Sequence, residues 1–315
     1  MRIAVVGAIK SDLILKVPKL PEFGQFVRAD EFLPCAGGKG ANIAVAVARA
    51  GVHAQIIGCV GDDEQGSTTR ATLEQAGVDV QSVKVMKDSQ SSMVILLLNS
   101  IGESTGVIVR GAAEQLDAQW VTRALCPVND PPRVLVVTFD SLPQTISATI
   151  RLGRELGIPV IVDAGPAQGY GPEIWSQCTI LTPNTTEAST LVGHPINDDA
   201  SVVRAARKLL AYGPQTVVVR RGALGSFLAT SDFEGFLPAL PVRAVDATGA
   251  GDAFTGTLAV AVAHDLPLRS AVQRGNAAGA KATTRVGALA SMPTSAEIDE
   301  LLSQFSGTAY GFRAP

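Results

Sequence analysis

The amino-acid sequence predicts an α/β fold with a mostly parallel central sheet, and three observations support this prediction. Short apolar segments with the character of buried strands recur along the chain, at residues 3–6, 55–60, 134–137, 160–162, 180–182 and 216–220. Segments with helical patterning lie between them, which is the order expected for parallel strands. Polar residues fall at the strand ends, where such sheets bind ligands, and they are Asp140, Asp163, Asn184, Arg220 and Asp246.

The first third of the chain also contains segments that suit a small, separate sheet. After the strand at 3–6 and Gly7, residues 12–17 have mixed apolar and polar character, and Pro18 and Pro21 follow. Alternation and edge prolines are typical of an exposed sheet. With strand-like segments at 83–85, 93–98 and 106–110 and a turn at 99–102, they predict a lid of about four strands, formed by residues 12–34 and 91–111.

The helices that we expect to cover the central sheet show apolar periodicity, and several are followed by glycine. Gly51, Gly77 and Gly157 follow the helices predicted at 43–50, 66–75 and 143–156. Further helices are predicted at 116–125, 173–177, 187–191, 200–211, 253–263, 268–284 and 295–304. The chain shows no internal repeat and no low-complexity segment, so we expect a single domain over residues 1–315.

The composition narrows the class of protein. Hydrophobic residues make up 46% and charged residues 17%, which allows a large core. The 26 basic and 29 acidic residues give a net charge of −3 without basic runs, which argues against a nucleic-acid partner. The four cysteines lack metal-site spacing and indicate buried thiols in a reducing compartment. Neither a signal peptide nor an apolar stretch near the roughly 18 residues of a membrane span is evident, so we expect a soluble, cytoplasmic protein without a membrane partner.

A glycine-rich turn that opens a helix lies at residues 246–256, with the sequence DATGAGDAFTG. Helix N-termini present unpaired amides and partial positive charge, and glycine lets an anion approach the backbone closely. We therefore expect Gly249, Ala250 and Gly251 to form an anion hole. Asp252 follows at the place that suits a general base beside a transferring phosphate. The alternative is an aspartate in the first turn of an ordinary buried helix.

A second glycine-rich stretch, GGKGAN, occupies residues 37–42. Gly37 and Gly38 permit close backbone approach to a sugar, and Asn42 offers a donor and an acceptor for neighbouring hydroxyls. The alternative is a glycine turn in which Asn42 bonds locally. Lys39, taken alone, is equally consistent with a lysine that faces water.

A third motif, TPNTTE, lies between the other two at residues 182–187. Asn184 and Glu187 follow a strand end, where their oxygens suit Mg²⁺ held through its waters or, alternatively, local helix caps. The three motifs, in this order, resemble those of the ribokinase family of carbohydrate kinases, the PfkB sugar kinases. The resemblance spans nearly the whole chain and implies a three-layer αβα sandwich with a β-sheet lid.

The family resemblance implies roles for residues on the sugar side of the site. Asp12, Gly38, Lys39 and Asn42 match positions that bind the sugar, and Asp140 matches a position where ribokinases usually carry the longer glutamate. Ribokinases have asparagine where this chain has Lys10. Lys10, together with Lys39 and Arg110, would suit an anionic acceptor, whereas an outward-pointing Lys10 would leave a neutral sugar.

The resemblance also implies the nucleotide side of the site. ATP is expected at Asn184, Arg220, Gly222, Gly225 and Asn276, and Mg²⁺ at Glu187 with Asn184 through water. A monovalent cation, K⁺, is expected at a loop that contains Asp246, Thr248, Ala282, Gly287 and Ser291. No GxxxxGK[ST] motif is present, so this is not a P-loop enzyme.

These features favour an ATP-dependent kinase that phosphorylates a primary hydroxyl of a pentose such as ribose. Fructose, a nucleoside, or an anionic phosphosugar or sugar acid are the alternative acceptors. A non-catalytic sugar or nucleotide sensor on the same fold is a further alternative, although an intact Asp252 argues against it. Because one face of so small a lid sheet needs a partner, we expect a homodimer joined lid to lid.

Overall fold

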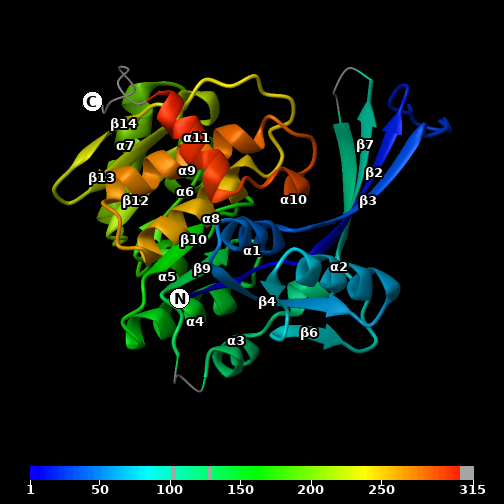
Figure 1. Cartoon of the computed structure of the whole chain (residues 1–315), viewed down its shortest axis with the longest axis horizontal. Coiled ribbons are helices and arrows are strands. Elements are labelled where there is room, and N and C mark those ends of the chain that lie inside the picture. The colour runs from blue at the N-terminus through cyan, green and yellow to red at the C-terminus, as the bar shows by residue number, and fades with distance from the viewer. Residues whose placement is uncertain (101–103, 127–129, 306–315) are drawn as a thin grey trace.

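A ten-stranded sheet of buried strands forms the centre of the computed structural model, which describes residues 1–100, 104–126 and 130–305 (Figure 1). Its strand order is β14-β13-β12-β11-β10-β9-β1-β4-β5, with β6 also paired to β4. Neighbouring strands run parallel, except for the pairs β12–β13 and β13–β14, which run antiparallel. The strands are β1 (Arg2–Val6), β4 (His53–Gly61), β5 (Val78–Asp79), β6 (Val83–Met86), β9 (Val134–Thr138), β10 (Val160–Asp163), β11 (Ile180–Leu181), β12 (Thr216–Arg220), β13 (Ser226–Thr230) and β14 (Glu234–Leu237).

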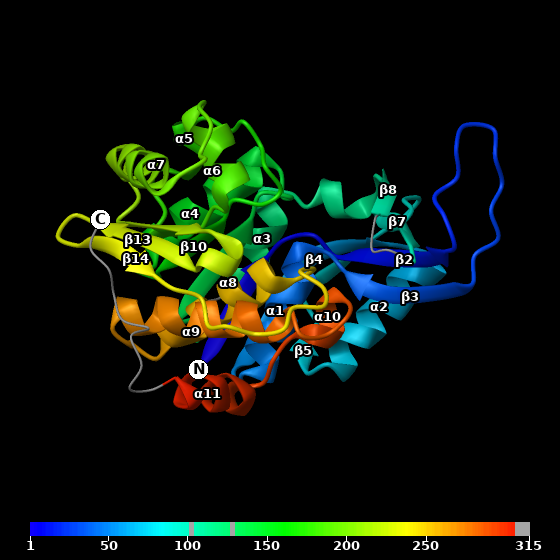
Figure 2. The same ribbon diagram turned by 90° about the horizontal axis from the view of Figure 1, so that it is seen from above.

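Helices cover both faces of this sheet, because alternate strand residues point to opposite sides. Ile3 and Val5 belong to one apolar core, and Ala4 and Val6 belong to the other. The first core is closed by α1 (Lys39–Arg49), α8 (Ala250–Ala263), α9 (Leu268–Ala282) and α11 (Ser295–Gln304), and the second by α3 (Ala118–Leu125), α4 (Pro143–Glu155), α6 (Thr185–Val192) and α7 (Asp199–Ala211). Figure 2 shows these two helix layers on either side of the sheet, which confirms the predicted α/β sandwich.

A second sheet of four strands extends away from the main body (Figures 1 and 2). Its order is β3-β2-β7-β8, with β2 (Lys10–Val17), β3 (Glu31–Gly37), β7 (Met93–Asn99) and β8 (Ser104–Val109). At its base, the Ser11 hydroxyl donates to Gln65 Oε1 over 2.9 Å, which links β2 to α2 (Glu64–Gln75). The prediction of a small separate sheet is therefore confirmed, with β2, β3, β7 and β8 as its strands, while part of the turn predicted at 99–102 lies outside the described residues.

Several element predictions differ from the structure, and three differences matter for the site and the lid. Residues 83–85 were expected in the lid, but β6 pairs with β4 in the main sheet. The helix expected from residue 43 starts at Lys39, because Gly38 adopts a φ of +93° and the glycine motif forms the first turn. The helix expected at 116–125 starts at Ala118 as α3, because the Asp117 carboxylate caps its first turn, and a 3₁₀ turn (Ala112–Gln115) precedes it.

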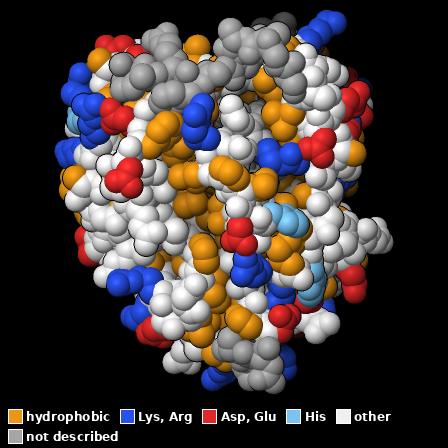
Figure 3. Space-filling model, turned by 60° about the vertical axis from the view of Figure 1, so that its left-hand side comes forward, with side chains coloured by type: hydrophobic (Ala, Val, Ile, Leu, Met, Phe, Trp, Pro, Cys, Tyr) orange, Lys and Arg blue, Asp and Glu red, His pale blue; other side chains and the backbone are white. Residues whose placement is uncertain are grey.

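Strands β13 and β14 were not predicted as such. They extend the central sheet at its edge beyond β12, and short elements complete the chain: α5 (Pro172–Trp175), η2 (Gly222–Leu224) and α10 (Ala288–Ser291). Within residues 1–100, 104–126 and 130–305, no helix combines the length and apolar character needed to cross a membrane. The face in Figure 3 mixes basic and acidic side chains around a band of hydrophobic ones, in line with the net charge of −3.

Candidate active site

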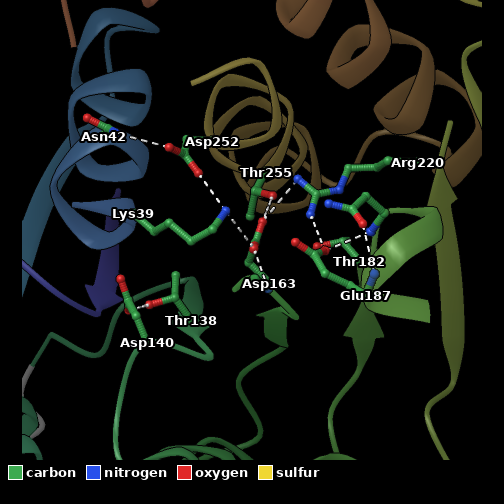
Figure 4. Close-up of polar contacts among 12 residues, drawn as sticks. Lys39, Asn42, Thr138, Asp140, Asp163, Thr182, Glu187, Arg220, Asp252 and Thr255 are labelled. Carbon is green, nitrogen blue, oxygen red and sulfur yellow. Dashed lines mark hydrogen bonds and ion pairs between the residues drawn. The ribbon is translucent and has the colours of Figure 1, made fainter. Parts of the chain in front are cut away.

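Asp252 lies in the first turn of α8, directly after the glycine turn, and only 5% of it is exposed. Gly249 is the N-cap residue of this helix, with a φ of +78° that favours glycine. Two side chains of α1 bond to the carboxylate: Asn42 Nδ2 donates to Oδ2 over 2.8 Å, and Lys39 Nζ lies 3.2 Å from Oδ1 (Figure 4). The structure thus brings together the first and last sequence motifs, which are 210 residues apart at Asn42 and Asp252.

The ionisation of Asp252 is set by opposing effects. Burial raises the pKa of Asp252 above its usual value, Lys39 opposes this, and Asp163 raises it further. A carboxyl whose pKa is raised is a stronger base once ionised, so this environment suits proton abstraction from an alcohol. The alternative of an ordinary helix aspartate does not account for a buried carboxylate with charged partners from another helix.

Asp163 was not predicted as a site residue, although it was noted at a strand end. It ends β10, is fully buried, and has four polar partners. Lys39 Nζ lies 3.3 Å from Oδ1 and Arg220 Nη1 lies 3.2 Å from Oδ2; the Gly165 amide and the Thr255 hydroxyl donate over 3.0 and 2.7 Å. Burial opposes ionisation, but Arg220 and Lys39 hold the pKa of Asp163 below its usual value. The signal in the sequence was its position beside Asp140 and Asn184 in the row of strand ends.

Arg220 ends β12 and lies behind the glycine turn. Besides Asp163, its guanidinium contacts Glu187, with Nη2 to Oε2 at 3.1 Å, while Nε is buried without a partner among the described residues. A Cβ at Gly251 would lie 2.3 Å from Arg220 Nη1. A larger residue at 251 would displace the paired guanidinium, so glycine lets this buried cation lie next to the predicted anion hole.

The sugar-side residues surround the ends of β1 and β2. A Cβ at Gly38 would lie 2.5 Å from the Ala8 carbonyl, and one at Gly37 would lie 2.1 Å from Asp12 Oδ2, so both glycines allow close packing. Burial raises the pKa of Asp12 to about 6, with Lys10 acting in the opposite direction. Asp140 Oδ1 accepts from the Ala8 amide over 3.2 Å and from the Thr138 hydroxyl. Asn42 Oδ1 is buried and has no partner in the described part of the chain.

Lys10 and Arg110 have different surroundings. Lys10 is two residues from Asp12 on β2, hence on the same face, and it pairs in register with Gly37, which has no side chain to cover it. The Arg110 side chain is 85% exposed, with Nε 3.8 Å from Glu114 Oε1. Of these three cations, Lys39 is the one paired with buried carboxylates in the described part of the chain.

Asn184 and Glu187 form a capping box at the start of α6. Asn184 Oδ1 accepts from the Glu187 amide over 2.9 Å, and Glu187 Oε2 accepts from the Asn184 amide over 2.7 Å. The local caps expected as the alternative are therefore present, and Glu187 also forms an ion pair with Arg220. Residues 1–100, 104–126 and 130–305 contain no group of three or more His, Cys, Asp or Glu side chains able to hold a metal. One carboxylate still fits Mg²⁺, which in proteins often relies on substrate phosphates and water.

The remaining nucleotide-side residues lie beyond β12. Gly222 and Gly225 bound the 3₁₀ turn after this strand, with φ values of +57° and +86°. A Cβ at Gly225 would lie 2.1 Å from the Leu237 carbonyl oxygen, so the backbone at Gly225 packs closely against the end of β14. Asn276 Nδ2 donates to the same carbonyl over 3.1 Å, which fastens α9 to this segment.

Hydrogen bonds join three residues of the loop at which a monovalent cation is expected. Asp246 Oδ1 accepts from the Thr248 amide and hydroxyl over 2.9 and 2.6 Å, and Oδ2 accepts from the Gly287 amide over 2.8 Å. The Ser291 hydroxyl donates a hydrogen bond to the Ala288 carbonyl. Burial opposes ionisation of Asp246, but these hydrogen bonds lower its pKa. An ionised carboxylate fits a monovalent cation, whereas Ala282, at the buried end of α9, could offer only its backbone carbonyl.

Comparison with known proteins decides the family. A model described as "pfkB family carbohydrate kinase" matches residues 1–295. The chain belongs to the pfkB family of carbohydrate kinases. Consistent with this, it is an ATP-dependent carbohydrate kinase, and the arrangement of Asp252 at the glycine turn is the part of the site where phosphoryl transfer chemistry is expected.

Individual known kinases resemble the chain along nearly its whole length. A ribokinase of Bacillus subtilis is 31% identical over 302 residues, covering 96% of this chain and 99% of the relative. A deoxyribokinase of Salmonella typhi is 30% identical over 304 residues, covering 96% and 99%. The structure of Arabidopsis thaliana ribokinase complexed with ribose and ATP matches with a TM-score of 0.85 at 26% identity, covering 95% of this chain and 98% of that one.

Proposed function

We propose that this protein transfers the γ-phosphate of ATP to a primary hydroxyl of a pentose such as ribose, with Asp252 as the general base. The observation that carries the proposal is the buried Asp252 carboxylate, which lies at the glycine turn of α8 and bonds to Lys39 and Asn42. The ribose and ATP named for the Arabidopsis thaliana relative support both substrates, and the ribokinase of Bacillus subtilis supports the acceptor.

The chemistry follows from the arrangement around Asp252. The sugar hydroxyl gives its proton to an Asp252 oxygen while its own oxygen bonds to the γ-phosphorus, and the bond to the bridging oxygen breaks to release ADP. The amides of Gly249, Ala250 and Gly251 stabilise the charge of the transferring group. The ammonium of Lys39, 3.2 Å from Asp252, supplies positive charge at the same place.

The sugar is held at the other side of Asp252. Asn42 Oδ1, a buried acceptor without a described partner, is available to a sugar hydroxyl. Asp12, mostly ionised at neutral pH with a pKa of about 6, accepts further hydroxyls, and Gly38 lets the ring approach the backbone. Asp140 contributes its remaining oxygen, since Oδ1 is engaged by Ala8 and Thr138.

The nucleotide is assigned to the other half of the sheet edge, with phosphates at the α8 turn and the remainder near Asn184, Arg220, Gly222, Gly225 and Asn276. Mg²⁺ would be held by the phosphates, with Glu187 and Asn184 acting through water, and would supply positive charge to the transferring group. K⁺ would be held by Asp246 and neighbouring carbonyls. We further propose a cytoplasmic homodimer joined lid to lid, since β8 exposes Val107 (61%) and Ile108 (63%).

An anionic acceptor is the second candidate, and a single observation favours it. Lys10 shares the Asp12 face of β2, and no ion pair of its ammonium is found in the described part of the chain. The exposed Arg110 does not strengthen this case. We therefore keep the neutral pentose as the main proposal, with 2-deoxyribose beside ribose because of the deoxyribokinase relative.

The test is ATP consumption with a panel of acceptors: ribose, 2-deoxyribose, fructose, a nucleoside, and phosphorylated and carboxylated sugars. We expect the highest kcat/KM with a neutral pentose. A highest value with an anionic sugar would overturn the acceptor assignment and leave the kinase. Thermal stabilisation by a sugar that is never phosphorylated, with no turnover of any acceptor, would instead identify a sensor.

A further inference from the structure

Lys39 lies between two buried carboxylates at almost equal distances. Its Nζ is 3.2 Å from Asp252 Oδ1 and 3.3 Å from Asp163 Oδ1 (Figure 4). The three side chains come from different elements: Lys39 opens α1, Asp163 ends β10 and Asp252 opens α8. One ammonium is thus shared by the proposed base and by a carboxylate that has no exposed surface and so no access to a substrate.

Asp163 is fixed in place independently of Lys39. Its Oδ2 accepts from Thr255 over 2.7 Å and lies 3.2 Å from Arg220 Nη1, while Oδ1 also accepts from the Gly165 amide over 3.0 Å. Because these three other partners hold the Asp163 carboxylate, it does not move when Lys39 moves. Lys39 is therefore the movable member, and its position depends on the balance between a fixed anion and Asp252.

A shared ammonium affects the base directly. If Lys39 paired with Asp252 alone, a full ion pair in a buried site would stabilise the carboxylate and reduce its affinity for a proton. Dividing the ammonium between two anions weakens that pairing, and the negative charge of Asp163 acts in the same direction.

We propose that Asp163 is a positioning residue that draws Lys39 partly away from Asp252 and so keeps Asp252 basic enough to accept the proton of the sugar hydroxyl. The inference rests on the proposed function, because it assumes that Asp252 is the base. Asp163 acts through Lys39 and touches no reacting atom. Its second partner, Arg220, balances the charge that it adds to the buried site.

The charged groups that face Asp252 fix the expected direction. They are Lys39 on α1, Asp163 at the end of β10, Arg220 at the end of β12 and Asp12 on β2. Replacing Asp163 with asparagine removes a negative charge and leaves Lys39 wholly to Asp252. Both changes lower the pKa of Asp252, so the carboxylate ionises at lower pH and becomes a weaker base.

The experiment compares wild type, Asp163→Asn, Lys39→Met and the double variant, with Thr255→Val as the control that removes one partner of Asp163 without changing its charge. The Asp252 ¹³C-carboxyl titration, assigned by its absence in Asp252→Asn, is followed by NMR in ligand-free protein. This readout needs no turnover, so it remains informative if the panel assay rejects every sugar. Where a sugar is phosphorylated, kcat is measured across pH.

We expect the Asp252 titration and the acid limb of kcat to move to lower pH in Asp163→Asn, with kcat at neutral pH reduced about tenfold and both KM values changed less than about threefold. Lys39→Met should move the titration to higher pH, which also serves if Asp163→Asn does not fold. Asp163→Asn should have a smaller effect in the Lys39→Met background. An unmoved titration in Asp163→Asn, an equal shift in Thr255→Val, or a downward or absent shift in Lys39→Met would overturn the proposal.

Discussion

The centre of the active site and the lid use charge and apolar surface in opposite ways. At the centre, Asp163, Arg220 and Asp252 are nearly or fully buried, and each is paired with opposite charge. In the lid, the ion pair between Lys16 and Glu31 is nearly half exposed, while large apolar side chains such as those of β8 face outward. The two regions differ in what packs against them. Strand ends and helices surround the centre of the active site, whereas the lid is a single sheet.

The centre of the active site and the lid therefore suit different functions. Buried charges must be held by rigid neighbours, because each unpaired charge is costly, and these neighbours keep the Asp252 carboxylate in place for chemistry. An unsupported sheet cannot provide such a setting, but it can cover a substrate and present apolar surface to a partner. Changes of the same kind should therefore have unequal effects in the two regions.

The two regions should differ most in the free energy of unfolding lost when one partner of an ion pair is removed. Arg220→Met leaves the Asp163 and Glu187 carboxylates buried without their arginine, and we expect a loss of about 3–5 kcal/mol in the free energy of unfolding. Lys16→Met breaks the exposed lid pair and should cost at most about 1 kcal/mol. Urea denaturation of both variants measures the difference, and equal losses would contradict the comparison.

Glycine replacement should give a smaller but still distinct contrast. Gly38→Ala combines a φ of +93° with a Cβ only 2.5 Å from the Ala8 carbonyl, so we expect destabilisation of about 2–3 kcal/mol and weaker sugar binding. Gly24→Ala in the loop between β2 and β3 has a φ of +81° but nothing within 4 Å of the Cβ, and should cost about 1 kcal/mol. Thermal melts and sugar titrations measure both variants, and equal losses of stability and of sugar affinity would refute the expected contrast.

Charge on the lid should change assembly and leave the fold unaffected. Val107→Lys combined with Ile108→Lys places charge on both faces of β8, and light scattering at micromolar concentration should show a mass that falls from twice to once 32.6 kDa. Val85→Lys, at an exposed valine of the main sheet, is the matched control and should leave the mass unchanged. A fully active wild-type monomer would disprove the lid-to-lid dimer.

Lys10 should have the smallest effect if the acceptor is neutral. It lies at the junction of the lid and the site, and Lys10→Asn should alter kcat/KM for ribose by about threefold or less, because a partly exposed charge near Asp12 contributes little. An anionic acceptor would instead lose turnover sharply in this variant. Parallel kinetics with ribose and with phosphorylated and carboxylated sugars on both proteins distinguish the two cases.

The sequence revealed the parts of the site that lie in local motifs. Gly38, Asn42 and Asp252 were recognisable because close approach of an anion or a sugar needs glycine and a polar side chain at a helix start, and this requirement is local. The roles of Asp163 and Thr255 were not recognisable, because their contact joins positions 92 residues apart and exists only when β10 and α8 meet. A buried carboxylate of this kind has no signature of its own.

The fold was predictable to a similar degree and for a related reason. Apolar strands and periodic helices identified the parallel sheet, and the helix at Ser295–Gln304 has the predicted bounds because Thr294 and Glu297 cap it locally. The alternating pattern of β6 did not reveal its partner, since pairing with β4 or with the lid demands the same pattern. Strands β13 and β14 were missed because they join the sheet through pairing that begins at β12, which their own residues do not specify.

The central claim, that Asp252 is the base of a pentose kinase, is tested most directly by the kcat of Asp252→Asn with ATP and ribose, measured beside calorimetric binding of both ligands. Asparagine keeps the shape of the side chain and removes its ability to take a proton. The account predicts a fall in kcat of roughly 10²-fold or more, with the melting temperature and both affinities nearly unchanged. A near-normal kcat in Asp252→Asn would contradict it.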